Sequence, residues 1–298
     1  MRALITGGKG FVGHWLAAHL KDAGDEVVVI DVETDICDGP ALRKVVAEVS
    51  PEAVYHLAAM THVGESWENP SAVLRVNVLG TAELLAAARA LTRPPVVLVV
   101  SSAEVYGSVT VEQLPLAEST PTAPATPYAA SKLAAEAVAL QAWRGYRQPV
   151  IVVRPFNHIG PGQSPNFAVP ALAKRIVEAR KAGAGTLRVG TLTTRRDFTD
   201  VRDVVVAYRL LVERGTAGTV YNVCTGRDVS IAEVADELLS LAQAALELVT
   251  DADLVRPVDV PVLRGDPSLL RATTGWSPTI PLATTLSDVL TSWEEEAD

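Results

Sequence analysis

The sequence predicts an α/β protein built on a doubly wound parallel sheet, with a smaller α/β cap in its C-terminal part. Short apolar runs rich in β-branched residues alternate with helix-length stretches whose apolar residues recur every three or four positions. The run Val96–Val100 contains only valine and leucine, as a strand buried on both faces requires. Strands that alternate with helices are joined by right-handed crossovers, so we expect a parallel sheet with helices on both faces.

The first half of the chain supplies most of this sheet. The expected strands are Arg2–Thr6, Glu26–Asp31, Ala53–Leu57, Pro95–Ser101 and Val150–Arg154. The expected helices are Phe11–Ala23, Ala41–Ser50, Ala72–Leu91 and Tyr128–Tyr146. Pro40, Pro51 and Pro70 stand at the expected helix boundaries, where proline is best tolerated.

The alternation becomes less regular after residue 155, which predicts a division into two parts. We expect residues 1–155 to form the sheet domain and 156–298 mainly the cap, with a segment from about 190 to 227 returning to the sheet domain. The expected helices are Ala168–Ala182, Arg202–Arg214, Ile231–Ala244 and Leu282–Glu295. The expected strands are Leu187–Val189 and Val220–Cys224.

Composition excludes several classes of protein. The chain has 26 Lys and Arg against 35 Asp and Glu, a net charge of −9, which disfavours a nucleic-acid or anionic-membrane partner. Residues 154–214 differ, because they contain eleven Lys and Arg but only five Asp and Glu, a basic region suited to one small dianion.

Two cysteines, no apolar run of about 18 residues and no signal peptide before the first strand indicate a soluble cytoplasmic protein. The five histidines lack ligand spacing, so no metal is expected.

A glycine-rich loop joins the first expected strand to the first expected helix. Gly7, Gly10 and Gly13 recur at three-residue spacing within Thr6–Gly13. Small residues allow a pyrophosphate to approach the backbone, and the following helix N-terminus offers free N–H groups and a positive dipole end. The context predicts a dinucleotide-binding (Rossmann) domain. The residues expected to contact the cofactor are Gly7, Gly10, Phe11, Val12 and Gly13.

The ends of the second and third strands are expected to complete the dinucleotide site. Asp31 can hydrogen-bond both ribose hydroxyls of adenosine and repel a 2′-phosphate, which favours NAD(H), with NADP(H) as the alternative. Asp35 and Ile36 are alternative contacts for the ribose and adenine. The run Leu57-Ala58-Ala59 ends the third strand, and its small residues suit a backbone that passes close to the cofactor.

Tyr128, Lys132 and Ser102 form the candidate catalytic group. Tyr128 and Lys132 are four residues apart and project from one helix face. An ammonium about 4 Å from a phenolate stabilises it by roughly 4 kcal/mol at an effective dielectric constant of about 20, so we expect Lys132 to lower the pKa of Tyr128. Lys132 can also hold the nicotinamide ribose, and Ser102, at the end of the fourth strand, can hydrogen-bond the oxygen whose proton Tyr128 transfers. The expected chemistry is hydride transfer between a nicotinamide and a carbinol or ketone carbon.

The combined motifs resemble the extended short-chain dehydrogenases/reductases, in particular the nucleotide-sugar epimerase/dehydratase group. The resemblance spans nearly the whole chain, and its carriers are Thr6–Gly13, His56–Ala59, Asn77–Thr81, Ser102–Gly107 and Tyr128–Lys132. Further runs are most similar to the GDP-6-deoxy-D-mannose reductases of this group: Phe156–Gln163, Arg196–Asp203, Arg256-Pro257 and Val260-Pro261.

This resemblance implies a reaction and a set of substrate contacts. The implied reaction reduces the C4 ketone of GDP-4-dehydro-6-deoxy-D-mannose to give GDP-D-rhamnose, with hydride from NAD(P)H and a proton from Tyr128. The implied contacts to the sugar nucleotide are Asn157, Asn166, Lys174, Arg196 and Arg256. The family commonly pairs the helices equivalent to Ala72–Leu91 and Tyr128–Tyr146, which are rich in Ala and Leu around much of their circumference, so we expect a homodimer.

Three other functions stay open on the sequence. A nucleotide-sugar 4-epimerase with tightly bound NAD would use the same Ser102, Tyr128 and Lys132. A GDP-mannose 4,6-dehydratase would need an acid where Ala103 stands, although Glu104 is present as a candidate catalytic base. A non-catalytic dinucleotide-binding protein would need none of these side chains.

Overall fold

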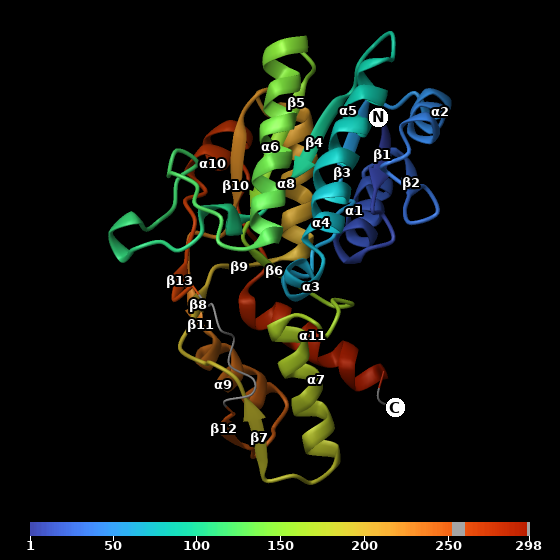
Figure 1. Cartoon of the computed structure of the whole chain (residues 1–298). Helices are drawn as coiled ribbons and strands as arrows, with labels where there is room; N and C mark the ends of the chain where they lie inside the picture. The colour runs from blue at the N-terminus through green and yellow to red at the C-terminus, as the bar shows by residue number, and fades with distance from the viewer. Residues whose placement is uncertain (252–259, 297–298) are drawn as a thin grey trace.

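A computed structural model describes residues 1–251 and 260–296. Its centre is a six-stranded parallel sheet with the order β10-β5-β4-β3-β1-β2 (Figure 1). The strands are β1 (Arg2–Thr6), β2 (Glu26–Ile30), β3 (Ala53–His56), β4 (Val96–Val100), β5 (Val150–Pro155) and β10 (Val220–Val223). The predicted doubly wound parallel sheet is confirmed.

Helices cover both faces of this sheet. On one face lie α1 (Phe11–Asp22) and α8 (Val201–Arg214), and on the other α2 (Gly39–Val49), α5 (Gly80–Arg89) and α6 (Pro127–Tyr146). Successive strand residues point to opposite faces, so Ala3 and Ile5 pack with the first pair of helices while Leu4 packs with the second group. Two buried cores therefore hold the sheet in place.

The helix boundaries follow from capping groups. The Asp38 carboxylate accepts a hydrogen bond from the Ala41 backbone N–H at 3.1 Å, and Thr126 caps α6 in the same way. Each of these helices has a proline in its first turn, where its missing N–H leaves no helical hydrogen bond unmade. Both helices consequently begin one or two residues earlier than the sequence predicts.

The helix expected over Ala72–Leu91 is divided by a π-helical turn. It consists of α4 (Pro70–Leu74), the turn η1 (Arg75–Leu79) and α5. Asn77 lies in this turn, and its amide group bonds the N–H and C=O of Met60 and the hydroxyl of Ser131 on α6. Among the described residues, the stretch Pro70–Arg89 is long and apolar enough to span a membrane, but many core helices satisfy the same criterion and this one is 44% buried.

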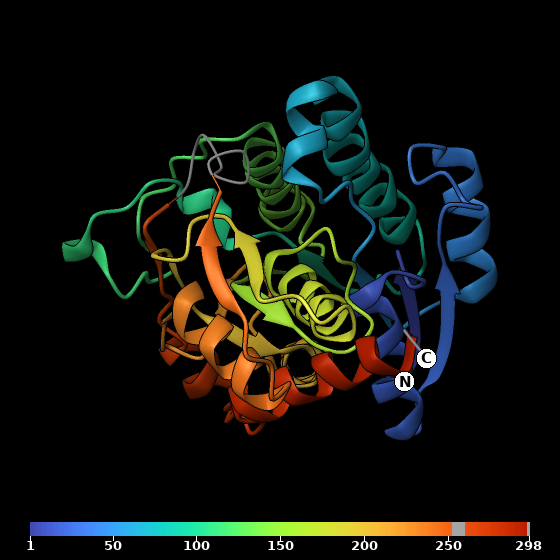
Figure 2. The same cartoon turned by 90° about the horizontal axis from the view of Figure 1, so that it is seen from below.

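Most of the remaining elements form a cap at the carboxyl ends of the strands, below the sheet in Figure 1, whereas α10 (Ser268–Thr274) packs on α8 beside the sheet. A third apolar core joins α7 (Ala168–Lys181), α9 (Ile231–Leu241) and α11 (Leu282–Glu296) with β7 (Thr186–Val189), which pairs with β12 (Glu247–Thr250); Figure 2 views these elements from below. The short elements are β6 (Asn157–Ile159), β8 (Arg195–Arg196), β9 (Phe198–Asp200), β11 (Val229–Ser230), β13 (Val262–Leu263), α3 (Val63–Glu68), α10 (Ser268–Thr274), η2 (Ala103–Tyr106) and η3 (Val111–Gln113).

Candidate active site

The glycine loop between β1 and α1 is packed so closely that it excludes side chains. Gly7 has φ +68°, and a Cβ there would lie 2.7 Å from the backbone nitrogen of Ala58. A Cβ on Gly13 would lie 2.5 Å from the carbonyl oxygen of Gly7. Gly10 directly precedes α1 and has no side chain that could bond the first turn, so the N–H groups of that turn can bind an anion without a competing side-chain acceptor.

This loop lies at the switch point of the sheet. The chain leaves β1 toward β2 on one side, and it leaves β3 toward β4 on the other. Ligands of open α/β sheets bind in the crevice at such a point, beside the carboxyl ends of the strands. The Gly7–Ala58 approach joins those two strand ends. The residues present therefore fit a dinucleotide whose pyrophosphate rests on the start of α1.

The acidic segment after β2 is folded back onto the glycine loop. The Asp31 carboxylate accepts hydrogen bonds from the backbone N–H of Lys9 at 2.7 Å and of Val32 at 2.9 Å. Lys9 in turn pairs with Glu33 at 3.0 Å. Asp31 thus lies beside the phosphate loop, where a sequence-predicted ribose ligand belongs.

The two alternative adenosine contacts lie in different environments. The Asp35 carboxylate is half-exposed and pairs with Arg75 at 3.1 Å. Ile36 is buried, and a Cβ on Gly80 would lie 2.6 Å from its Cδ1. Ile36 thus belongs to the core on the α2–α5 face of the sheet. Burial of its aliphatic side chain there is favourable because it removes apolar surface from water. The contact of Ile36 with adenine stays a prediction.

The catalytic candidates meet where β4 ends against α6. Tyr128 is 8% exposed and hydrogen-bonds Ser102. Lys132 donates from Nζ to the carbonyl of Val100 at 2.8 Å, and Nζ lies 6.0 Å from the centroid of the Tyr128 ring. Glu104 is close enough to act electrostatically on Tyr128. Ser102, Glu104, Tyr128 and Lys132 are therefore brought together as the sequence predicts.

The electrostatics of this group differ from the prediction. Burial raises the pKa of Tyr128, the Glu104 carboxylate raises it further, and the hydrogen bond with Ser102 acts in the opposite direction. Burial also lowers the pKa of Lys132 to about 8, against the effect of Glu136. The expected lowering of the pKa of Tyr128 by Lys132 is thus wrong for this geometry, because the ammonium is directed to a backbone carbonyl. Tyr128 is held in the protonated form that a general acid needs.

The predicted substrate residues are spread over the cap. Asn157 is exposed at the start of β6, and Asn166 is exposed in the turn that precedes α7. Arg196 on β8 donates from Nη1 to the carbonyls of Arg195 and Val260 at 2.8 and 2.7 Å. Arg256 lies outside the described residues.

Lys174 on α7 lies against α11. Its Nζ lies 5.3 Å from the centroid of the Trp293 ring on α11 and 3.9 Å from the Glu178 carboxylate one turn along α7. A long cationic side chain on an amphipathic helix covers a neighbouring aromatic surface readily. The contact of Lys174 with the nucleobase or phosphates of the substrate stays a prediction.

The Phe11–His158 stack and the contacts of Glu136 lie near the site and are not evident from the sequence motifs. Phe11 stacks on His158, with ring centroids 6.2 Å apart and planes 9° from parallel, which joins the phosphate loop to the cap. Glu136 lies four residues beyond Lys132 and binds both Ser101 and Arg154 beneath the site. The four-residue spacing between Lys132 and Glu136 can be read from the sequence, but the partners of Glu136, one directly after β4 and one on β5, are far away along the chain.

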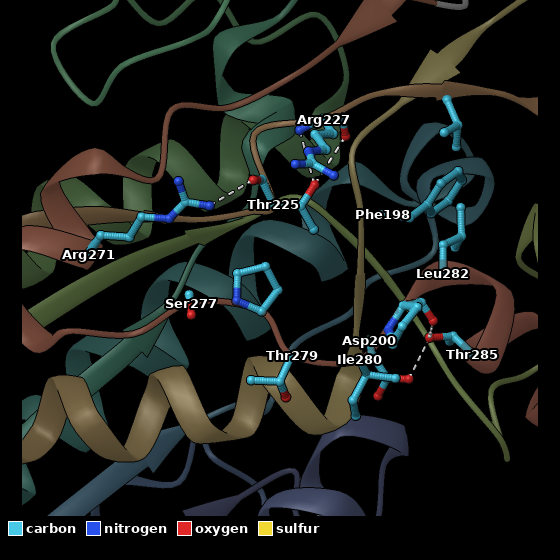
Figure 3. Close-up of a pocket in the computed structure, with 13 residues that line it drawn as sticks. Phe198, Asp200, Thr225, Arg227, Arg271, Ser277, Thr279, Ile280, Leu282 and Thr285 are labelled. Carbon is cyan, nitrogen blue, oxygen red and sulfur yellow. Dashed lines mark hydrogen bonds between the residues drawn. The ribbon is translucent and has the colours of Figure 1, made fainter.

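A separate cavity of about 540 Å³ lies between β9, the loop after β10 and the segment 277–282 (Figure 3). Phe198, Ile280 and Leu282 supply apolar walls, and Arg227 and Arg271 line one side. None of the predicted catalytic or cofactor residues lines this cavity. Within residues 1–251 and 260–296 there is no cluster of three or more side chains able to hold a metal ion.

The fold and this site define a short-chain dehydrogenase/reductase that acts on a nucleotide sugar. Residues 31–289 match the family model described as GDP-mannose 4,6 dehydratase, and the chain belongs to that family. GDP-6-deoxy-D-mannose reductase of Pseudomonas aeruginosa is 40% identical over 98% of this chain and 97% of its own length. The RMD structure from Pseudomonas aeruginosa, complexed with NADPH, has a TM-score of 0.92 at 38% identity and covers 99% of this chain and 100% of that one. UDP-glucose 4-epimerase of Thermus thermophilus, complexed with NAD, has a TM-score of 0.87 at 28% identity, with 99% of each chain covered.

Proposed function

We propose that this protein reduces the C4 ketone of GDP-4-dehydro-6-deoxy-D-mannose to GDP-D-rhamnose at the expense of NAD(P)H. The observation that carries the proposal is the contact of Ser102 with a buried, protonated Tyr128 beside a dinucleotide loop. The likeness to a GDP-6-deoxy-D-mannose reductase over almost the whole chain supports the choice of substrate.

The proposed chemistry divides between the cofactor and three side chains. When bound, the reduced nicotinamide supplies a hydride to C4 of the sugar. Ser102 orients the ketone oxygen by a hydrogen bond, and Tyr128 donates its phenolic proton to that oxygen. Lys132, held by the Val100 carbonyl at 2.8 Å, would hold the nicotinamide ribose, and the Tyr128 phenolate that remains regains its proton from solvent. Burial keeps Tyr128 in the phenol form with which a reduction begins.

The choice between the two cofactors is carried by Asp31. A carboxylate at the end of β2, already bonded to the Lys9 N–H, suits the paired hydroxyls of an unphosphorylated ribose and repels a 2′-phosphate. We therefore propose NAD(H) as the preferred cofactor. The NADPH complex of the Pseudomonas aeruginosa structure makes NADP(H) the alternative to be measured.

The proposed division of labour assigns the cofactor to residues 1–155 together with the segment of about 190–227, and the sugar nucleotide mainly to the cap. Asn157 and Arg196 are the described residues proposed to meet the diphosphate, because a guanidinium offers paired donors to phosphate oxygens. Asn166 is proposed near the nucleobase. Arg256 keeps its proposed phosphate contact on the resemblance alone.

We also propose that the protein is a cytoplasmic homodimer. Leu74 and Leu79 are 46% and 57% exposed on the α4–η1–α5 stretch, and Trp67 on the neighbouring α3 is 57% exposed. Apolar side chains gathered on adjoining helices are typical of a subunit interface. Light scattering of the purified protein measures the mass directly; a monomeric mass at micromolar concentration would overturn the dimer.

The test of the reaction is cofactor stoichiometry. Purified protein is mixed with GDP-4-dehydro-6-deoxy-D-mannose and either NADH or NADPH, and the absorbance of the reduced nicotinamide is followed. One equivalent of cofactor oxidised per GDP-D-rhamnose formed supports the proposal. Unchanged absorbance with both cofactors would exclude it.

The second candidate is a nucleotide-sugar 4-epimerase, favoured by the NAD complex of a structurally similar epimerase. An epimerase keeps its NAD and consumes none, so conversion of a UDP- or GDP-hexose without added cofactor would select it. The dehydratase reaction is disfavoured because Ala103, the first residue of η2, has no ionisable side chain.

A further inference from the structure

Three consecutive residues at the end of β4 are each bonded to a different residue of α6. The carbonyl of Val100 accepts from Lys132, the hydroxyl of Ser101 donates to Glu136 at 2.5 Å, and Ser102 bonds Tyr128. Tyr128, Lys132 and Glu136 follow one another at four-residue spacing, so they lie on one face of the helix. Lys132 contacts the first of the three strand residues, and Tyr128 contacts the third. The contact between them, Ser101–Glu136, is made by residues that take no part in the proposed chemistry.

Glu136 is itself held from a third element. Arg154 on β5 donates from Nε to Oε1 at 2.9 Å and from Nη2 to Oε2 at 2.7 Å. The side chains of Arg154 and Glu136 are 7% and 3% exposed. A two-point arginine–carboxylate contact fixes both distance and orientation, so the carboxylate cannot rotate away from Ser101 without leaving Arg154.

The guanidinium is positioned in turn by further contacts. Its Nη1 donates to the Glu118 carbonyl at 3.2 Å, and its centre lies 4.9 Å from the Tyr106 ring centroid. Tyr106 donates from its hydroxyl to Asn222 on β10 at 2.7 Å. The anchor of Glu136 therefore reaches across β5 to the edge of the sheet.

We propose that Ser101 and Glu136 are positioning residues, which fix the carboxyl end of β4 against α6 so that Ser102 and Lys132 are aligned with Tyr128. The inference rests on the proposed hydride-transfer function and adds two residues to its machinery. Neither residue touches substrate or cofactor in this assignment. Arg154 acts through Glu136 and secures the same alignment.

Glu136 has a second, electrostatic effect on the site. Its carboxylate raises the pKa of Lys132, whereas burial lowers that pKa to about 8. The other titratable groups that face Lys132 are Tyr128 on the same helix and the neutral His56 on β3. Loss of the Glu136 charge should therefore move the deprotonation of Lys132 to lower pH, while loss of the Ser101 hydroxyl should not.

The structure offers a control with the same chemistry at another place. Thr285 on α11 is 1% exposed and donates its hydroxyl to Asp200 at 2.7 Å, and Asp200 is paired with Arg202. Figure 3 shows this contact beside the separate cavity. Thr285→Val and Ser101→Ala thus each remove a buried hydroxyl that donates to an arginine-paired carboxylate.

The kinetic experiment compares these two variants with the wild type. We expect Ser101→Ala to lower kcat at least tenfold, with the KM for sugar nucleotide and cofactor changed less than twofold, because misalignment acts on the transition state. Thr285→Val should keep kcat within twofold while losing a similar amount of thermal stability. Equal effects of the two variants on kcat, or an unchanged kcat in Ser101→Ala, would overturn the positioning role.

A second measurement does not depend on turnover. NMR of the labelled lysine Nζ groups, with the Lys132 signal assigned by Lys132→Arg, follows the titration of Lys132 in each folded variant. We expect Glu136→Gln to lower the titration midpoint by about one pH unit and Ser101→Ala to leave it in place. An unchanged midpoint in Glu136→Gln would exclude the electrostatic role of Glu136. If the titration is as expected but the wild type shows no turnover, the proposed function is rejected and the electrostatic role of Glu136 is not.

Discussion

Gly7 gives the sharpest test of the cofactor loop, because the structure predicts both a stability loss and a binding loss. In Gly7→Ala the new Cβ would lie 2.7 and 2.8 Å from the backbone N and Cα of Ala58. Backbone atoms cannot rotate away as a side chain can, so β1 and β3 must separate at their carboxyl ends. The positive φ of +68° adds a conformational cost of about 1–2 kcal/mol for an L-residue.

Gly24 provides the matched control. It has φ +82°, but a Cβ there would meet nothing within 4 Å. Gly24→Ala should therefore lose only the conformational contribution of about 1–2 kcal/mol. Gly7→Ala should lose a further 1–3 kcal/mol, approximately the cost of overpacking a closely packed site.

The assay is urea unfolding with the slope m compared among the three proteins, followed by fluorescence titration with NADH and NADPH. We expect Gly7→Ala to raise the Kd of both cofactors by roughly tenfold or more, since the displaced loop no longer presents its N–H groups to the pyrophosphate. Gly24→Ala should bind as the wild type does. Equal stability losses in the two variants, or unchanged cofactor binding in Gly7→Ala, would refute the assignment of Gly7 to this contact.

Three further predictions address the acid, the cofactor choice and the response to pH. Tyr128→Phe should lower kcat by roughly 10²–10⁴-fold and leave the cofactor Kd nearly unchanged, since the phenol supplies a proton and little binding; retained turnover in stopped-flow assays would refute its role. Asp31→Ala should shift the ratio of NADPH to NADH affinity by about tenfold toward NADPH, since one repulsive charge is removed; an unchanged ratio would place the selectivity elsewhere. Burial lowers the pKa of His56 from 6.5 to about 3, so the unfolded chain binds the proton more readily and stability falls as pH drops from about 6.5 toward 3, by at most about 1.4 kcal/mol per pH unit. Urea unfolding across this range should show a shallower pH dependence in His56→Asn, and an unchanged slope would contradict the buried, neutral state.

The sequence predicts the sheet half well because its signals are local. Each strand there contains at least three consecutive apolar residues, and the strands β1 to β5 lie within one residue of the expected boundaries. The phosphate loop is likewise a strand, a turn and a helix start within one short stretch. Such features depend on neighbouring residues, so the chain order alone reveals them.

The cap is less predictable because its pairings are short and not local. Strands β8, β11 and β13 have two residues each, too few to show a period of two. The contact of Lys174 with Trp293 is not predictable for a related reason, because helix periodicity gives the face of Lys174 but not the identity of the residue opposite. Ser101, Glu136 and Arg154 come from three elements that the sheet brings together, and no spacing in the sequence joins them.

The net charge of the basic stretch 154–214 does not predict which of its arginines can bind a diphosphate. Arg154, Arg202 and Arg209 belong to it, and they pair with Glu136, Asp288 and Asp25. These three acids lie outside the stretch, so the local excess of cations is partly offset in the folded chain. Binding of a diphosphate depends on how each arginine side chain is positioned by its neighbours. Arg196 donates to the carbonyls of Arg195 and Val260, so these contacts, and not the net charge of the segment, fix the position from which it is proposed to meet the phosphates.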